Sequence, residues 1–152
     1  MMAPKKTILL LTDFSKRAEH AADFALELAK NNHANLLIYN SIISIGASVI
    51  TGERWSVESE ITEMTAKSTS RLSLLTTYLK AKLTTSQQSA IQITCKNGTG
   101  PVVETIIELV AENKIWMVVM GNHVENAIAI TYFDGNIPPV MNNCGCPLLL
   151  VP

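Results

Sequence analysis

Hydrophobic residues gather in short continuous runs, and longer stretches of mixed pattern separate these runs. A short continuous apolar run is typical of a strand that is buried on both faces of a parallel sheet. Ile91, Ile93 and Cys95 instead alternate with polar residues, which predicts a strand with one wetter face. The continuous runs are Thr7–Thr12, Leu36–Tyr39, Ile115–Gly121 and Pro147–Val151. Together the two patterns predict five strands.

The stretches between these strands carry apolar residues every three or four positions, the spacing of one helix face. Ser15 offers an N-cap to the first helix. Ile42–Ser56 has no clear period, so we expect a long surface loop in which Trp55 is either a lid or a packing anchor. Thr84–Gln88 should end the longest helix, and Asn97–Pro101 should form a turn. The predicted helices are Ser15–Asn31, Val57–Leu83, Pro101–Asn113 and a weaker one over Gly135–Asn142.

Strands that alternate with helices predict an α/β fold with an open, mostly parallel five-stranded sheet and helices on both faces. The length of 152 residues suits a single domain over residues 1–152. In such sheets ligands bind outside the carboxyl ends of the strands, where the strand order reverses. The strand that ends at Gly121 runs into a long loop, which makes this loop the first candidate for a ligand site.

Composition and charge narrow the class of protein. Hydrophobic residues make up 47% of the chain and charged residues 16%, which is ordinary for a globular protein. The net charge of −1 gives no general attraction to nucleic acid or to an anionic membrane. No apolar run reaches the roughly 18 residues of a membrane span, and Ile8–Leu11 is too short for a signal peptide. We therefore expect a cytoplasmic protein with no nucleic-acid or membrane partner.

The three cysteines leave two interpretations open. Cys144-Gly145-Cys146 has the spacing of a metal or redox pair, but the three histidines add no zinc motif to it. Reduced thiols at packed or partly exposed positions are the ordinary alternative, and a cytoplasmic location favours them. We expect no metal site.

Five segments occur along the chain in a characteristic order: Lys6–Ser15, Ala25–Ala29, Gly100-Pro101, Val118–Gly121 and Cys146–Val151. Through them the chain resembles the universal stress protein family over nearly its whole length. The resemblance implies a sheet of strand order 3-2-1-4-5, as in adenine-nucleotide alpha hydrolase-like folds. It also implies a homodimer in which the last strands of the two copies meet across the dimer axis.

Many members of that family bind ATP through a loop of the form G-x2-G-x9-G-[ST] after the fourth strand. In this sequence the first glycine is Gly121, the second position is Val124, and the final pair is Asp134-Gly135. Val124 is poorly suited to the positive φ that such a glycine can adopt. Asp134 would place a carboxylate where the loop must hold an anion. Gly135-Asn136 replaces the final pair only with a shift of one residue.

The resemblance defines a candidate nucleotide cleft. Asp13 matches the family position beside the adenine, and a capping or turn role before Ser15 suits this residue type equally well. His123 is either a general base or an exposed loop histidine. Lys16, Arg17 or a magnesium ion would have to neutralise the phosphates. The candidate ligand-binding residues are Thr12, Asp13, Gly121, Asn122, His123, Gly135 and Asn136.

Two functions follow from the resemblance and from these departures. The first is a stress-response binding or interaction module whose ATP site is lost or altered, and which works through its dimer surface or through another small ligand in the same cleft. The second is a protein that still binds ATP or AMP, with magnesium, through the altered loop. An enzyme is less favoured, because the sequence contains no nucleophile–base constellation and no P-loop.

Overall fold

The computed structural model describes residues 5–42, 54–99, 102–121 and 145–152, with the side chains of all of these except 54–58 and 102–103. The strands are β1 (Thr7–Leu11), β2 (Asn35–Ile42), β3 (Ile93–Thr99), β4 (Ile115–Gly121) and β5 (Leu148–Val151). The helices are α1 (Lys16–Asn32), α3 (Arg54–Ala81), α4 (Thr85–Ala90) and α5 (Val102–Asn113). The five predicted strands are therefore all present.

The strands form one sheet in the order β3-β2-β1-β4-β5, and every neighbouring pair is parallel. This confirms the predicted α/β class and the strand order implied by the family resemblance. The chain builds β1, β2 and β3 outward in one direction and then returns to place β4 on the other side of β1. The strand order therefore reverses between β1 and β4, which is where open α/β sheets bind ligands.

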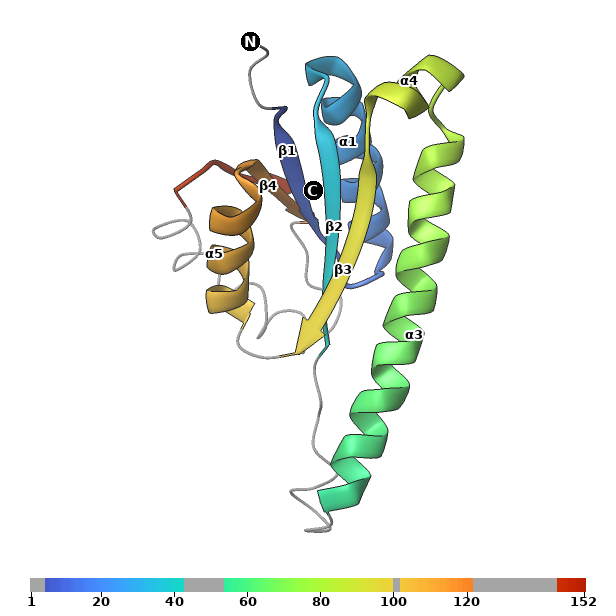
Figure 1. Ribbon diagram of the computed structural model, residues 1–152, viewed down its shortest axis with the longest axis vertical. Helices are drawn as coiled ribbons and strands as arrows, with labels where there is room; N and C mark the ends of the chain where they lie inside the picture. Colours follow the sequence, from blue (N-terminus) through green and yellow to red (C-terminus); the bar gives the residue numbers. More distant parts are fainter. Residues whose placement is uncertain (1–4, 43–53, 100–101, 122–144) are drawn as a thin grey trace.

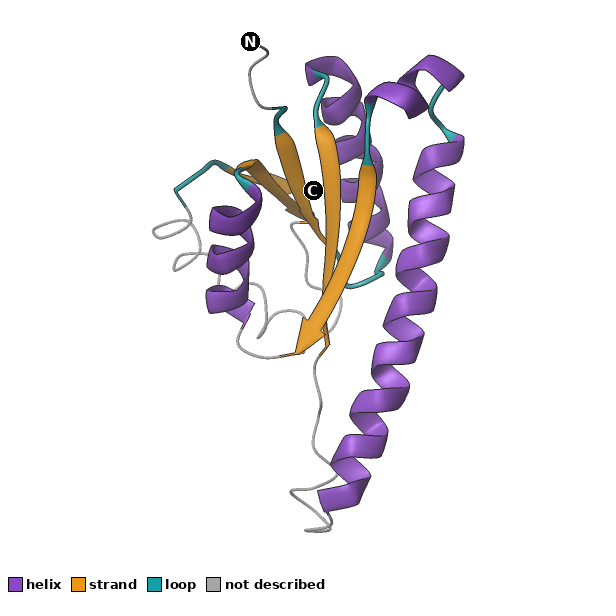
Figure 2. Cartoon of the chain, in the orientation of Figure 1, coloured by secondary structure: helices purple, strands orange, loops and turns teal. Residues whose placement is uncertain are grey.

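Helices cover both faces of the sheet, with α1 and α3 on one face and α5 on the other (Figures 1 and 2). Successive β1 side chains supply the two hydrophobic cores in turn. Ile8 and Leu10 pack under α1, whereas Leu9 and Leu11 pack under α5. Because successive side chains point to opposite faces, a strand that is buried on both faces needs an apolar residue at every position, which gives a continuous apolar run.

Helix α1 begins where the sequence predicts. The Ser15 Oγ accepts a hydrogen bond from the Ala18 N–H at 3.2 Å, which confirms Ser15 as the N-cap. His33 closes the helix in a left-handed conformation with φ of 51°. The face that packs on the sheet consists largely of fully buried alanines, whose small side chains let the helix lie close to the strands. These are Ala21, Ala22, Ala25 and Ala29.

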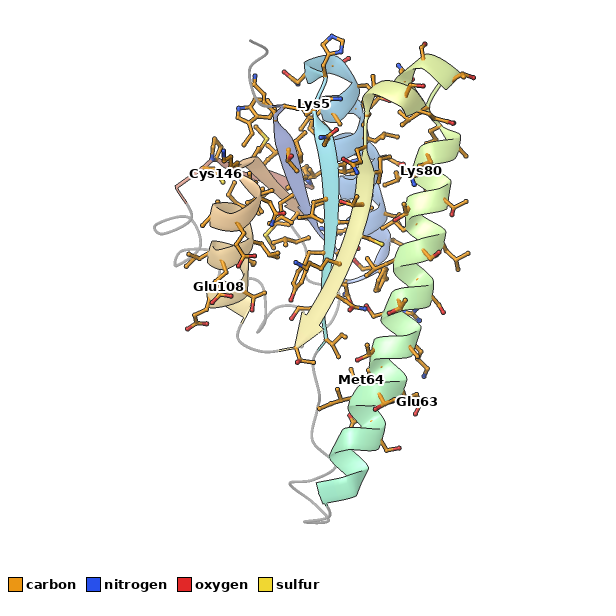
Figure 3. All side chains as sticks on the ribbon, viewed as in Figure 1. Lys5, Glu63, Met64, Lys80, Glu108 and Cys146 are labelled. Carbon is orange, nitrogen blue, oxygen red and sulfur yellow. The ribbon has the colours of Figure 1, made fainter. Side chains whose placement is uncertain are left out.

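Helix α3 has 28 residues and, at 1.5 Å per residue, is roughly 42 Å long. It extends well past the carboxyl edge of the sheet (Figure 1). In this projecting part Met64 lies on the side turned toward the rest of the molecule, and Glu63 points away (Figure 3). The helix begins at Arg54, so the predicted loop Ile42–Ser56 extends too far at its end. Trp55 is in the first turn of the helix, and its side chain lies outside the described part.

One local prediction was wrong, and one helix was not predicted. Helix α3 ends at Ala81, just before Thr84–Gln88 as predicted, but this segment also opens the short helix α4. Thr84 and Gln87 form a capping box, with each side chain bonded to the other residue's backbone N–H. Asn97–Thr99 is the last part of β3 and not a turn, since it pairs with the end of β2. Gly98 suits this strand because a Cβ there would lie 3.0 Å from the Tyr39 Oη.

The remaining predictions concern the last helix, membrane spans, metal sites and the number of domains. The weak helix Gly135–Asn142 lies outside the described residues. None of the helices in the described ranges is both long enough and apolar enough to cross a membrane. No cluster of three or more His, Cys, Asp or Glu side chains suited to a metal occurs within those ranges. The single-domain assignment stays a prediction.

Candidate functional site

Backbone and side-chain hydrogen bonds fix the chain at the carboxyl end of β1. Thr12 is only 3% exposed, and its N–H donates to the Tyr39 carbonyl at 3.0 Å. Its Oγ1 accepts from the Phe14 N–H at 3.0 Å. Thr12 therefore extends the β1–β2 pairing by one residue and starts the turn into α1.

Asp13 works as a turn residue in this loop. Its Oδ1 accepts a hydrogen bond from the Ser15 N–H at 2.9 Å, which is the turn role that its residue type allows. Phe14, between these two residues, has φ of 63°, a left-handed conformation that is uncommon for a bulky side chain. The Asp13 Oδ1 is therefore engaged before any ligand arrives. The second carboxylate oxygen makes no hydrogen bond to another described residue.

Gly121 ends β4 directly beside the first turn of α1. A Cβ at this position would lie 3.2 Å from both the carbonyl carbon and the carbonyl oxygen of Arg17, and 3.4 Å from the Ala18 nitrogen. These neighbours are backbone atoms, which cannot rotate out of the way. A glycine thus lets β4 end against the N-terminus of α1, where the helix dipole favours negative charge.

Asp13 and Gly121 line one small hollow between the ends of β1 and β4, together with Ser15 and Arg17. Its volume of about 10 Å³ leaves room for about one water molecule. Thr12 does not line it, and belongs instead to a larger hollow between α1 and α3. The structure therefore unites two of the predicted site residues. Four others lie outside the described residues, namely Asn122, His123, Gly135 and Asn136.

A chain of buried polar contacts behind this edge was not predicted from the sequence. The Asn40 Nδ2 donates to the Thr12 carbonyl at 2.8 Å, and the Asn40 Oδ1 accepts from the Ser68 hydroxyl at 2.7 Å. The Asn97 Nδ2 in turn donates to the Ser68 Oγ at 3.2 Å. These contacts tie β1, β2, β3 and α3 together at the carboxyl edge. The available signal was Ser68, which lies four residues before the core residue Leu72 and so on the same helix face.

The fold and the position of this hollow define a doubly wound α/β protein with a candidate ligand cleft at its strand-order reversal. The sequence profile of the Universal stress protein family matches residues 5–152. The chain belongs to the universal stress protein family. No curated protein matches the sequence.

Solved structures of other universal stress proteins share the fold. UspA from Lactobacillus plantarum superposes with a TM-score of 0.74 at 14% identity, over 99% of this chain and 100% of that one. A universal stress family protein from Burkholderia pseudomallei gives 0.67 at 20%, over 97% and 96%. A universal stress protein in complex with cAMP gives 0.57 at 20%, over 97% of each chain. At these identities the likeness establishes the fold.

Proposed function

We propose that this chain is a stress-response binding module that acts as a homodimer and has lost tight ATP binding. The observation that carries the proposal is the loop after β4. Where ATP-binding relatives have their second glycine and the glycine of their final pair, this chain has Val124 and Asp134. A branched side chain restricts the backbone there, and a carboxylate repels phosphate oxygens.

The geometry around Gly121 supports the importance of this loop. Because β4 ends against the first turn of α1, the loop starts beside the positive end of the helix dipole, which favours an anion such as phosphate. A negative side chain brought to the same place competes with the ligand for that field. The cleft in this proposal remains open to a small ligand with less negative charge than a triphosphate.

A second function rests on a different observation. Asp13, Gly121 and Arg17 line the same hollow, so a carboxylate and a guanidinium both lie beside the place where the resemblance puts a nucleotide. A structurally similar relative was solved with cAMP, which is a nucleotide with one phosphate. The alternative is therefore AMP or ATP bound with magnesium through an altered loop. An enzymatic role is not part of either proposal.

The dimer is proposed on the exposed edge of the sheet. Among the described strands β5 is the outermost one next to β4, and its leucines 148–150 are only half buried in the single chain. An unpaired, apolar edge strand favours pairing with another chain. A cytoplasmic location, with no nucleic-acid or membrane partner, stays a prediction from composition.

Titration calorimetry of the purified chain with ATP, AMP and cAMP, with magnesium present, tests the two functions. We expect no heat of binding from ATP at concentrations up to about 1 mM. A dissociation constant of about 1 mM corresponds to a binding free energy of roughly −4 kcal/mol, so any weaker binding would escape detection. The variant Val124→Gly/Asp134→Gly/Gly135→Ser restores the family pattern and should bind ATP at least tenfold more tightly. Micromolar ATP binding by the unmodified chain would contradict the proposal.

Two further variants locate any nucleotide that does bind. Asp13→Asn keeps an oxygen that can accept the Ser15 N–H and removes the charge, so the turn should survive while a contact to the base is altered. Asp23→Asn makes the same change on α1 away from the cleft and is the matched control. Weaker nucleotide binding in Asp13→Asn alone would establish the second function.

A further inference from the structure

A second and larger hollow lies between the start of α1 and the middle of α3. Its volume is about 460 Å³, within the range of small-molecule sites, and it shares no described lining residue with the hollow beside Gly121. The described residues that line it are Thr12, Phe14, Glu19, Arg71, Leu74, Leu75 and Tyr78. Neither of the proposed functions uses this hollow.

Two exposed hydrophobic side chains lie on the walls of the hollow. Leu74 is 71% exposed and Tyr78 is 48% exposed, and these are two of the three large hydrophobic side chains that the described part of the chain leaves in water. Phe14 supplies an aromatic ring from the opposite side, on the turn that its left-handed backbone shapes. Exposed apolar surface gathered around a concavity is typical of a binding site.

Arg71 brings a positive charge to the hollow, and no described carboxylate forms an ion pair with it. Its guanidinium lies 5.6 Å from the centroid of the Phe14 ring, and it makes no hydrogen bond or ion pair to any other described residue. Lys82 differs, because it bonds the Asp23 carboxylate at 2.6 Å while lying 4.3 Å from the Tyr78 ring centroid. A guanidinium beside an aromatic ring is well suited to a carboxylate on a flat ligand.

Glu19 restricts the charge of that ligand. Its carboxylate also lines the hollow and likewise has no partner among the described residues. A ligand with several negative charges would be repelled by it, whereas one carboxylate can pair with Arg71 at acceptable cost. The combination favours a monoanion over a nucleoside triphosphate.

We propose that this hollow binds a small aromatic monoanion, with one or two fused rings and a single carboxylate. The ring packs against Phe14, Leu74 and Tyr78, and the carboxylate pairs with Arg71. The site is independent of the nucleotide cleft, so it stands whether or not the chain binds ATP.

Protein-detected NMR on the full chain, labelled with ¹⁵N and titrated with 2-naphthoate, tests this site. We expect amide shifts at the residues that line the hollow. Arg71→Gln should weaken binding about tenfold, the effect of losing one charge-assisted hydrogen bond. The uncharged analogue 2-naphthamide should bind the unmodified chain about tenfold more weakly than 2-naphthoate, because it lacks the carboxylate that pairs with Arg71.

Lys67→Gln is the matched control, because it removes one exposed positive charge from the same helix outside the hollow. It should leave the affinity unchanged. Leu74→Gln, at an exposed helical position, should weaken 2-naphthoate without unfolding the chain. Equal affinities of Arg71→Gln and the unmodified chain would overturn the assignment. Shifts confined to the residues around Gly121, or displacement by excess AMP, would do the same.

Discussion

Asn40 has both halves of its side-chain amide engaged, although the residue is only 9% exposed. Its oxygen depends on the Ser68 hydroxyl, and its nitrogen holds the Thr12 carbonyl at the end of β1. A buried polar group of this kind costs little while it is paired and a great deal when one partner is removed. The turn that carries Asp13 is thus supported from behind by a residue on α3.

Ser68→Ala tests this support. The substitution leaves the Asn40 Oδ1 buried without its donor, so we expect the free energy of unfolding to fall by about 1–3 kcal/mol. The Asn97 Nδ2 keeps its hydrogen bond to the Thr69 hydroxyl at 3.1 Å, so Asn97 should not add to the loss of stability. Urea unfolding followed by circular dichroism measures the difference.

Ser70→Ala, at an exposed position two residues along the same helix, is the control and should change stability by less than about 0.5 kcal/mol. Equal losses in both variants would mean that the helix backbone, and not the buried network, is responsible.

Part of the candidate site could be predicted at the residue scale. Asp13 and Gly121 were identified because each follows directly on an apolar run, and the parallel sheet brings the ends of such runs to one edge. Asn40 and Ser68 were missed because a polar residue inside an amphipathic pattern looks like a surface position. The spacing of Ser68 from Leu72 was a signal for Ser68 alone, and the packing of α3 on β2 shows that both residues are buried.

At the scale of elements, the periodicity of apolar residues located α1, α3 and α5 to within a few residues. It failed where the controlling interaction was not hydrophobic. Helix α4 buries none of its residues, and its capping box is the signal that the apolar pattern lacks. The end of β3 was read as a turn because Asn97-Gly98 is common in turns, yet pairing with β2 keeps it extended.

Lys82, just after the end of α3, bonds Asp23 on α1 and so joins the two helices. The hydrogen bond to Asp23 raises the pKa of Lys82 above its ordinary value of 10.5, and Tyr78 adds to the effect. A raised pKa means that the folded state holds this proton more tightly than the unfolded state. The contribution to stability is therefore complete below pH 10.5 and is lost as the pH rises through the higher, folded-state value.

We expect Lys82→Gln to lower the free energy of unfolding at pH 7 by no more than about 1 kcal/mol, since both side chains are about 40% exposed and screened by water. Unfolding curves of both proteins at neutral and alkaline pH measure the difference, which should shrink above pH 10.5. It should also shrink in about 1 M salt, which screens exposed charges. Lys67→Gln removes a more exposed pair on α3 alone and serves as the comparison. A difference that grows with pH would contradict the assigned direction.

At the scale of the whole molecule, the alternation of strands and helices predicted the fold class, but the strand order came from the family resemblance. The apolar runs alone do not say which strand lies next to which. The structure adds that both edges of the sheet differ in character. β3, at one edge, has exposed residues on both faces, whereas β5 at the other edge consists of half-buried leucines and a buried valine.

This difference predicts which edge forms the dimer. Leu148 on β5 packs partly on the core under α5 and leaves the rest of its side chain uncovered in the single chain. Sedimentation equilibrium at micromolar concentration should give twice the mass of the 16.6 kDa chain. Leu148→Lys should give the monomer mass, because pairing at β5 would bury the new charge.

Leu74→Lys places the same charge on an exposed leucine of α3, which packs mainly on β2 and β3 at the other end of the sheet from β5, and should leave the dimer intact. Circular dichroism confirms that each variant is folded before its mass is interpreted. A monomeric unmodified chain, or a dimer that Leu74→Lys dissociates, would move the interface away from β5. In the second case the interface would cover the hollow between α1 and α3, and the aromatic monoanion proposed there would compete with dimer formation.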